Sequence, residues 1–267
     1  MLTNDDGVHS PGLAALAGVL APLGELLIVA PREQQSGMGR SLPMFFDGRM
    51  VETTLHHNGQ SWPAYGVNAS PAQCVLHALL ELAPRRPALA VSGINYGENV
   101  GGGITVSGTV GAALEAAAGG IPALAVSLEV PIEHHTSNDA AVDFGVAAHF
   151  AHLFAARWLQ ATPLPDVDVL KIDVPASATP ETPWRITHLE RARYFRQLPP
   201  TRKRLDEEGR IGYMIDPRVE LAAGSDAGCL KAGVVSVTPL SIDLTSHIDF
   251  EVLRNGLENG QIGEDET

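Results

Sequence analysis

The fold of this chain is decided by the stretch Pro87-Ala88-Leu89-Ala90-Val91-Ser92-Gly93-Ile94-Asn95, in which a short apolar run is followed directly by polar residues. A compact apolar run is typical of a strand buried on both faces of a parallel sheet. Further runs of this kind occupy residues 25–31, 122–126 and 167–172, and stretches with helical spacing occupy 11–20, 71–82, 109–118 and 140–159. This alternation predicts an α/β fold with a doubly wound, mostly parallel sheet.

Two regions interrupt the alternation. Residues 43–67 contain Asp47-Gly48 and Asn58-Gly59 between β-prone runs, which predicts a β-hairpin excursion. Residues 184–240 are irregular apart from a candidate strand at 234–237. We expect a C-terminal hairpin arm that serves oligomerisation in this second region.

The chain is expected to form one domain over residues 1–257, followed by an acidic flexible tail at 258–267. A buried first strand needs about five residues, yet only Met1 and Leu2 precede Thr3-Asn4-Asp5-Asp6. Either this strand is unusually short or a few native residues are missing from the start, and we expect the second.

Composition limits the classes of function. The 267 residues are 45% hydrophobic and carry a net charge of −13, which argues against a general grip on polymeric nucleic acid. A small phosphate ester stays compatible, because one bound cation can reverse the local field. Neither a cysteine-rich framework nor an apolar window of about 18 residues occurs. These features predict a soluble, cytoplasmic protein with no membrane partner.

Hard oxygen donors follow three of the predicted strand or loop junctions. They are Asp5 and Asp6 in Thr3-Asn4-Asp5-Asp6-Gly7, Ser36 in Gln35-Ser36-Gly37, and Asn95. Such donors suit Mg²⁺ or Mn²⁺, with Ca²⁺ also compatible. Taken singly, the aspartate segment is equally compatible with an ordinary turn, and Ser36 or Asn95 alone is more often a plain loop or turn residue. Their convergence at the carboxyl rim of one parallel sheet is the argument for a metal site.

A glycine-rich loop runs from Asn99 to Gly111 and leads into the helical stretch at 109–118. Free backbone N–H groups and the positive end of a helix dipole bind phosphate without lysine. The same residues would also cap a helix that binds nothing, and no Walker motif is present. The residues predicted to contact phosphate or substrate are Asn4, His9, Gly37, Asn99, Ser107, Gly108 and Thr109.

Other catalytic arrangements are less well supported. His9 follows the aspartate pair closely and is the one histidine retained as a candidate proton donor or phosphate contact. His56-His57 and His134-His135 fall in polar turns and are expected at the surface. The serine-hydrolase motif Gly-x-Ser-x-Gly is absent. Asp5-Asp6 lacks the Asp-x-Asp spacing of phosphatases that form an aspartyl-phosphate, so direct attack by water on phosphorus is expected.

The sequence Thr3-Asn4-Asp5-Asp6-Gly7, together with Gln35-Ser36-Gly37, Ser92-Gly93-Ile94-Asn95 and Ser107-Gly108-Thr109-Val110-Gly111, resembles the SurE family of stationary-phase survival nucleotidases. The likeness extends to about residue 245. It implies a Rossmann-like core, a metal-dependent 5′/3′-nucleotidase acting on nucleoside monophosphates, and dimers or tetramers built by exchange of C-terminal elements. It also implies that Asp5, Asp6, Ser36 and Asn95 are the metal ligands. For the mechanism, our hypothesis is that Asp5 or Asp6 accepts the proton of the attacking water.

Several positions depart from the family pattern. Gln73 stands where an aspartate is usual, Lys171-Ile172-Asp173 replaces the more common Asn-Val-Asn, and Val106 replaces a frequent aromatic residue. These departures leave the ligand positions intact but leave substrate preference open. A non-catalytic nucleotide sensor and a broad acid phosphatase or exopolyphosphatase are the alternative functions.

Overall fold

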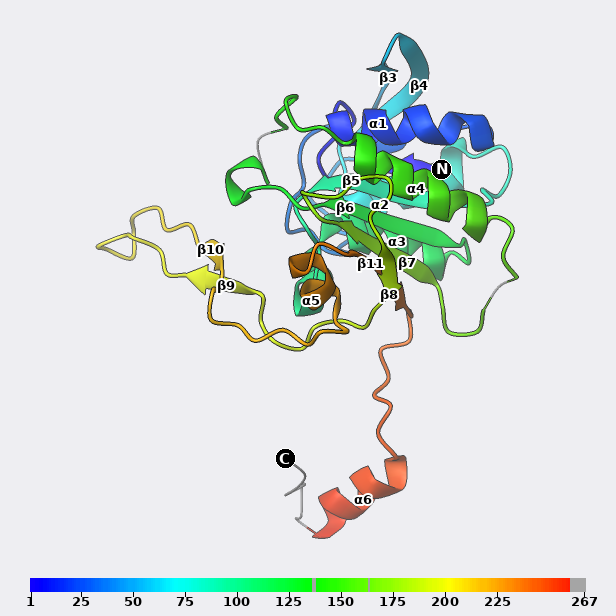
Figure 1. The fold of residues 1–267 in the computed structure, drawn as a ribbon. Coiled ribbons are helices and arrows are strands. Elements are labelled where there is room, and N and C mark those ends of the chain that lie inside the picture. The colour runs from blue at the N-terminus through cyan, green and yellow to red at the C-terminus, as the bar shows by residue number, and fades with distance from the viewer. Residues whose placement is uncertain (136–137, 163, 260–267) are drawn as a thin grey trace.

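The computed structural model describes residues 1–135, 138–162 and 164–259 of the chain. Its centre is a six-stranded sheet (Figure 1). The strands, in spatial order, are β1 (Leu2–Thr3), β5 (Ala90–Tyr96), β6 (Ala123–Leu128), β7 (Val169–Val174), β11 (Val235–Leu240) and β8 (Trp184–Ile186). The first four run parallel to one another, β11 is antiparallel to β7, and β8 is parallel to β11. The predicted mixed α/β fold with a mostly parallel sheet is confirmed.

Helices cover both faces of this sheet, and Figure 1 shows them as two outer layers. One face packs against α1 (Pro11–Leu20) and α4 (Gly145–Trp158), and the other against α2 (Pro71–His77) and α3 (Gly108–Ala118). All six residues of β6 are buried, because a central strand with helices on both sides has no solvent-facing side. The core is therefore split into two apolar clusters by the sheet itself.

Serine caps set the starts of the helices on which the site depends. Ser10 accepts the Gly12 N–H and is followed by Pro11 at the first helical position, an arrangement that favours helix initiation. Ser70 and Gln73 form a reciprocal capping box at the start of α2. The Gln73 departure from the family pattern thus completes a helix cap.

Two predicted element boundaries were wrong. The last long helix begins at Gly145 rather than at residue 140, because Asp143 Oδ1 accepts the Gly145 N–H at 2.8 Å and sets a turn there. The predicted helix at 71–82 has the observed bounds, and its last part changes to π-helical geometry at 78–82. The predicted strand at 25–31 is shortened to β2 (Val29–Pro31) and belongs to a separate three-stranded sheet.

The separate sheet has the order β2-β4-β3, with β3 at Met50–His57 and β4 at Gln60–Val67. β3 and β4 form an antiparallel hairpin closed at Asn58 and Gly59, whose φ angles are 47° and 77°. Positive φ at both positions is the signature of a hairpin turn that follows the strand twist. Asp47-Gly48, by contrast, lies in the loop before β3 and forms no hairpin turn.

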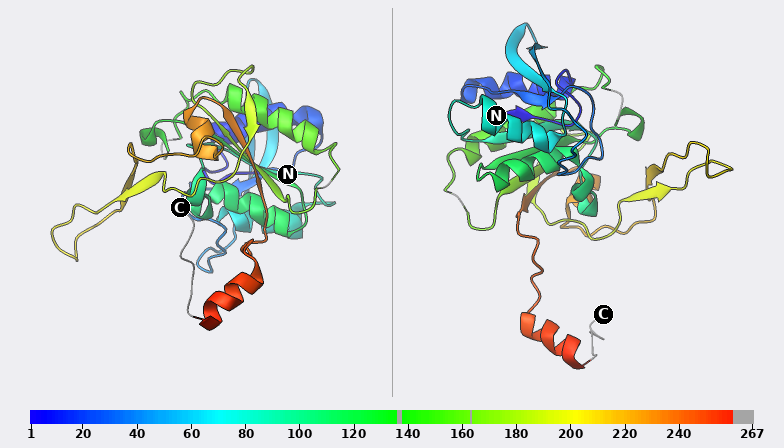
Figure 2. Two further views of the ribbon diagram at one scale, coloured as in Figure 1. Left: turned by 60° about the horizontal axis from the view of Figure 1, so that its bottom comes forward. Right: turned by 180° about the vertical axis from the view of Figure 1, so that it is seen from behind.

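The region 184–240 includes a two-stranded arm formed by β9 (Phe195–Leu198) and β10 (Gly212–Ile215), then α5 (Asp226–Lys231). Figure 2 shows the arm projecting from the domain and α6 (Phe250–Asn259) standing apart at the end of an extended segment. Glu258 and Asn259 are the last two residues of α6, and the domain bounds and the acidic tail at 258–267 stay predictions. The other residues of that tail, 260–267, lie outside the described residues, and the oligomerisation role of the arm stays a prediction.

None of the helices in the described ranges is long and apolar enough to cross a membrane.

Candidate active site

Asp5 lies beyond the end of β1 and contacts the first turn of α3. The Thr109 hydroxyl donates to Asp5 Oδ1 and lies 3.2 Å from Asn95 Oδ1. Because β1 and β5 pair in parallel with Thr3 opposite Ser92, the residues at their carboxyl ends reach the same rim. The structure therefore brings Asp5, Asn95 and Thr109 together at one point of the sheet.

The first turn of α3 is built around the Asp5 carboxylate. Burial raises the pKa of Asp5, while the Thr109 hydroxyl and the backbone N–H groups of Gly108 and Thr109 act in the opposite direction. A Cβ at position 108 would lie 2.7 Å from both Cβ and Oδ2 of Asp5. Glycine is thus required there for the carboxylate to approach the positive end of the helix dipole.

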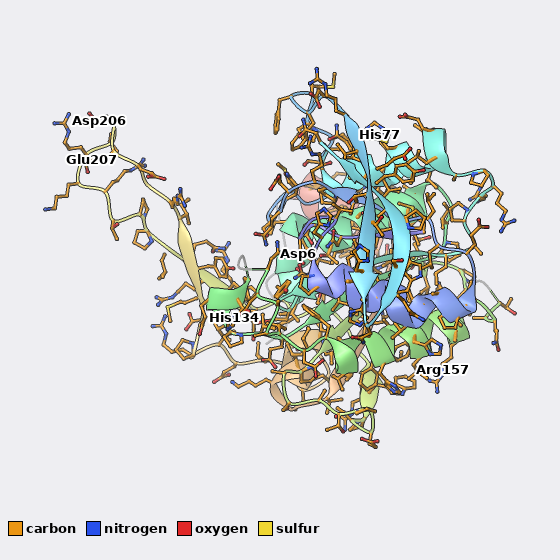
Figure 3. All side chains as sticks on the ribbon, turned by 90° about the horizontal axis from the view of Figure 1, so that it is seen from above. Asp6, His77, His134, Arg157, Asp206 and Glu207 are labelled. Atoms are coloured by element: carbon orange, nitrogen blue, oxygen red, sulfur yellow. The ribbon has the colours of Figure 1, made fainter. Side chains whose placement is uncertain are left out.

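Asp6 is buried beside Asp5 and is held by weaker contacts. Gln34 Nε2 donates to Asp6 Oδ1 at 3.2 Å, and the Tyr96 N–H reaches Asp6 Oδ2 at 3.4 Å. Burial, followed by the neighbouring charge of Asp5, raises the pKa of Asp6 well above its usual range. Figure 3 shows Asp6 beside α1, on the side of the domain from which the β9–β10 arm projects.

Asn95 presents an oxygen to the site. Its side-chain nitrogen donates to the Gly97 carbonyl at 2.6 Å, so its Oδ1 is directed toward Thr109. Ser36 and Gly37 lie on an exposed loop. The loop is attached to the site by the Gln35 N–H, which donates to the Asp5 backbone carbonyl at 2.7 Å. Ser36 therefore lies one residue from a direct anchor to the aspartate pair.

The glycine-rich loop is more regular than its sequence suggests. Residues Gly101–Val106 form a 3₁₀ helix, and Ser107 caps α3 by accepting the Val110 N–H at 3.1 Å. Asn99 is directed toward the sheet, where its side-chain nitrogen donates to Ser127 Oγ at 2.9 Å. The loop thus reaches the site through Ser107, Gly108 and Thr109, while Asn99 anchors its other end.

Asn4 and His9 occupy different environments. Asn4 is fully buried, and its side-chain nitrogen donates to the Gly7 carbonyl at 3.0 Å, which supports the turn that carries Asp5. Its Oδ1 is buried without a hydrogen-bond partner among the described residues. His9 is exposed after this turn, and the hydrogen bonds found in the described residues do not connect it to either carboxylate.

Several residues around Asp6 were not predicted from the sequence. Gln34 also donates to the backbone carbonyl of His135 at 3.1 Å, and Asn138 Nδ2 donates to the Asp6 carbonyl at 3.1 Å. His135 was expected at the surface but is partly buried, and its Nδ1 lies 2.9 Å from Tyr213 Oη on β10. The position of Gln34 next to Gln35-Ser36 was a usable signal. The His135–Tyr213 contact had none, because 78 residues separate the pair.

The donor set fits a hard divalent cation. Asp5 and Asp6 are 4% and 2% exposed, and within the described part of the chain no Lys, Arg or His forms an ion pair with either. Two adjacent buried carboxylates need a positive partner. The described ranges contain no cluster of three or more His, Cys, Asp or Glu side chains suited to a metal. The candidate ligands include only two carboxylates, Asp5 and Asp6. The other two candidate ligands are Ser36 and Asn95, which are not among these four residue types.

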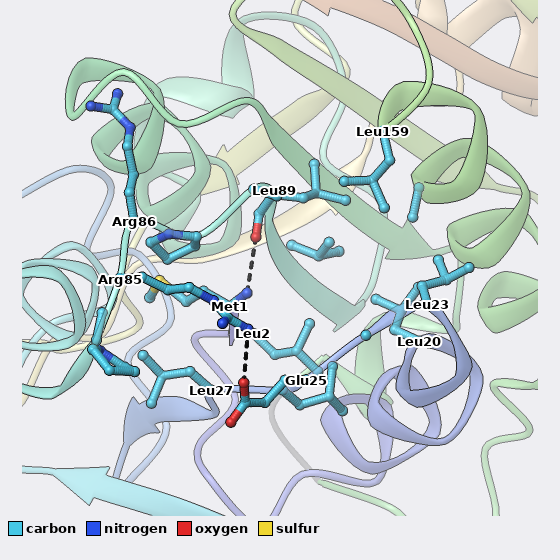
Figure 4. Close-up of a pocket in the computed structure, with 18 residues that line it drawn as sticks. Met1, Leu2, Leu20, Leu23, Glu25, Leu27, Arg85, Arg86, Leu89 and Leu159 are labelled. Atoms are coloured by element: carbon cyan, nitrogen blue, oxygen red, sulfur yellow. Dashed lines mark hydrogen bonds and ion pairs between the residues drawn. The ribbon is translucent and has the colours of Figure 1, made fainter.

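A separate cavity of about 350 Å³ lies at the opposite end of the strands (Figure 4). Its lining includes Met1, Leu2 and Leu89, and the Met1 ammonium donates to the Leu89 carbonyl at 2.9 Å. The candidate ligands lie at the carboxyl ends of β1 and β5, whereas this cavity lies at their amino ends. The two are distinct sites.

Comparison with known proteins agrees with these observations. The family model described as "Survival protein SurE" matches residues 1–196. A protein named 5′-nucleotidase SurE from Thermococcus gammatolerans is 41% identical over 260 residues, which cover 96% of this chain and 95% of the relative. A protein of the same name from Thermococcus kodakarensis is 40% identical over 260 residues, which cover 96% of this chain and 97% of that relative.

Similarity in three dimensions extends over the same length. The crystal structure of the SurE protein from Aquifex aeolicus matches with a TM-score of 0.71 at 30% sequence identity, covering 96% of this chain and 98% of that one. The match to the family model, the similarity of relatives over nearly the full length and the shared architecture all point to the same family. The chain therefore belongs to the SurE family.

Proposed function

We propose that this protein is a metal-dependent phosphomonoesterase that hydrolyses nucleoside 5′- and 3′-monophosphates to nucleoside and phosphate. The observation that carries the proposal is the buried Asp5–Asp6 pair, which lies against the first turn of α3 and shares Thr109 with Asn95. Relatives named 5′-nucleotidase over nearly the whole chain support the nucleotidase class. Activity on 3′-nucleotides is part of the proposal.

Asp5, Asp6, Ser36 and Asn95 are the residues proposed to hold the divalent cation, with Mg²⁺ or Mn²⁺ best suited and Ca²⁺ compatible. When bound, the cation would polarise the phosphate and ease deprotonation of the attacking water. Asp5 is held by Thr109 and by the start of α3, which suits a ligand with a fixed position. Asp6 has longer contacts, at 3.2 and 3.4 Å, and is proposed to accept the proton from water.

Substrate phosphate is proposed to bind between the carboxylates and the glycine-rich segment. Ser107 and the first turn of α3 offer a hydroxyl and a positive dipole end. Gly37 is proposed to border the same space, and Asn4 supports the turn beneath it. Asn99, predicted to contact substrate, is instead proposed to anchor the far end of the segment through Ser127 and Asp173. The exposed His9 is assigned no step.

Oligomerisation and location are separate proposals. A homodimer or homotetramer is proposed to form through the β9–β10 arm and the C-terminal segment, both of which extend from the domain in Figure 2. The arm carries exposed apolar side chains, among them Leu205 and Ile211, and such surface favours a protein partner. The net charge of −13 supports a protein without a general affinity for nucleic acid. A cytoplasmic location is part of the same proposal.

The deciding experiment measures phosphate release from a panel of 5′- and 3′-nucleoside monophosphates with Mn²⁺, Mg²⁺ or EDTA. Wild type and Asp5→Asn are compared, and calorimetric Mn²⁺ titration supplies a readout that is independent of turnover. Metal-dependent release that is lost in the variant supports the nucleotidase. Nucleotide binding without release would overturn it in favour of a sensor. Preference for generic phosphomonoesters or polyphosphate would favour a broad phosphatase.

A further inference from the structure

A second charged cluster lies inside the domain, away from Asp5 and Asp6. Lys171 Nζ donates to Asp173 Oδ2 and lies 3.0 Å from Asp226 Oδ2. All three side chains are fully buried. Lys171 and Asp173 alternate with apolar residues along β7 and so share one face of the sheet. Burying three charges is costly unless every one of them is paired and hydrogen-bonded.

The cluster is satisfied by backbone groups from the glycine-rich segment. Asp173 Oδ1 accepts the Asn99 N–H at 2.8 Å, and Asp226 Oδ2 accepts the Gly101 N–H at 2.9 Å. Asp226 Oδ1 also accepts the Glu190 N–H at 2.9 Å. One ammonium and two carboxylates leave a net negative charge, which these donors offset. The carboxylates therefore fix the beginning of the segment that ends at the first turn of α3.

The two charged residues on β7 compensate each other. Lys171 and Asp173 stand at alternate positions of β7, so one positive and one negative charge lie side by side on one face of the strand. A buried charge without an opposite partner is costly. The pairing places the Asp173 carboxylate beside Lys171, while its Oδ1 stays available to accept the Asn99 N–H.

From these contacts we propose that Lys171, Asp173 and Asp226 are positioning residues for the phosphate-binding segment 99–109. They act through the backbone of Asn99 and Gly101 and touch neither substrate nor reacting atoms. The inference rests on the proposed role of this segment in binding phosphate. Contacts that hold phosphate equally in ground and transition states change KM more than kcat. Disturbing the cluster should accordingly weaken substrate binding and loosen segment 99–107.

The test compares Lys171→Met with the double variant Lys171→Met/Asp173→Asn. The single variant leaves Asp173 and Asp226 uncompensated. The double variant removes one of these negative charges and keeps an amide oxygen for the Asn99 N–H. Thr238→Val is the matched control, because Thr238 is buried beside Lys171 on β11 and its hydroxyl pairs with Thr187 at 2.8 Å, away from the segment.

Hydrogen exchange of peptides covering 99–107 and steady-state kinetics with 5′-AMP are measured on each variant. For Lys171→Met we expect about tenfold faster exchange and a KM raised about tenfold, the size of one lost charge-assisted hydrogen bond. We expect kcat to change by less than about threefold. The double variant should recover most of both losses, and Thr238→Val should show neither.

Unchanged exchange and KM in folded Lys171→Met, or no recovery in the double variant, would overturn the proposal. If Lys171→Met does not fold, Asp226→Asn is judged by the same exchange and KM criteria, because it leaves Lys171 paired with Asp173 and disturbs the acceptor of the Gly101 N–H. If the wild type releases no phosphate from any nucleotide, the proposed function fails. The exchange of 99–107 in the variants still decides whether the cluster positions the segment.

Discussion

Replacing Thr109 by valine tests the centre of the candidate site with almost no change in shape. The Thr109 hydroxyl donates to Asp5 Oδ1 and lies 3.2 Å from Asn95 Oδ1, and Thr109 is fully buried. Water cannot easily replace the lost donor at such a position. A hydrogen bond to a charged group contributes about 1.5 to 3 kcal/mol. The N–H groups of Gly108 and Thr109 remain near Asp5, so we expect the lower part of this range.

A loss of about 1.5 to 2 kcal/mol corresponds to a fall in kcat/KM of roughly 10- to 30-fold. The assay is phosphate release from 5′-AMP with Mn²⁺. Thr109→Ser, which keeps the hydroxyl, should stay within about threefold of wild type. Ser107 caps α3 independently, so the helix start should persist; the midpoint of thermal unfolding should fall by only several degrees in Thr109→Val and stay near wild type in Thr109→Ser. A folded Thr109→Val protein with kcat/KM within twofold of wild type would refute the reasoning.

Two further predictions concern Glu98 and Gly108. Burial, with smaller effects of nearby carboxylates, raises the pKa of Glu98 from 4.5 to about 7. The folded state thus retains a proton that the unfolded state loses, and the stability this provides is present below pH 4.5 and lost as pH rises through 7. We expect the free energy of unfolding of the wild type, measured with urea, to fall between pH 5 and pH 8 by about 2 to 3 kcal/mol more than that of Glu98→Gln. Parallel pH profiles of the two proteins would contradict this. Gly108→Ala, whose Cβ would lie 2.7 Å from Asp5, should lower kcat/KM for 5′-AMP by about tenfold or more, whereas Gly102→Ala has open space around its Cβ and should match wild type. Equal activity of the two alanine variants would show that the close approach has no consequence.

Local signals in the sequence were enough to predict the layers of the fold. The helix at 11–20 was predicted with the observed bounds, because Ser10 and Pro11 are strong start signals that act over a single turn. The start at residue 140 was wrong because apolar spacing continues back through Val142, while the hydrogen bond from the Gly145 N–H to Asp143 sets a turn. Apolar spacing reports which face is buried and carries little information about where a helix begins.

The residues of the candidate site also fall into two groups, those that local sequence signals predict and those that they do not. Strand ends and helix starts carry Asp5, Asn95 and Thr109, so sheet topology alone predicts that they meet at one rim. Gln34 and Tyr213 reach the site from loops and from the arm, and no periodic pattern reports such contacts. Asp226 lies 125 residues from its partner Gly101. Pairings of that range depend on the tertiary fold, which composition and spacing do not encode locally.

The buried aspartates Asp5 and Asp6 differ from the buried aspartates Asp173 and Asp226 in one respect that bears on the proposed cation. Asp173 and Asp226 at the beginning of segment 99–109 have Lys171 between them. Asp5 and Asp6 at its other end are buried to a similar degree, yet within the described residues no basic side chain forms an ion pair with either.

Burial disfavours the ionised form of any carboxylate. Asp5 and Asp6, which have no basic partner among the described residues, therefore need an external positive charge or must retain protons. This contrast supports the proposal that a divalent cation completes the site. It also predicts that Mn²⁺ should stabilise the wild-type fold in thermal unfolding, and should do so less in Asp5→Asn. A thermal shift of equal size in both proteins would place the ion elsewhere.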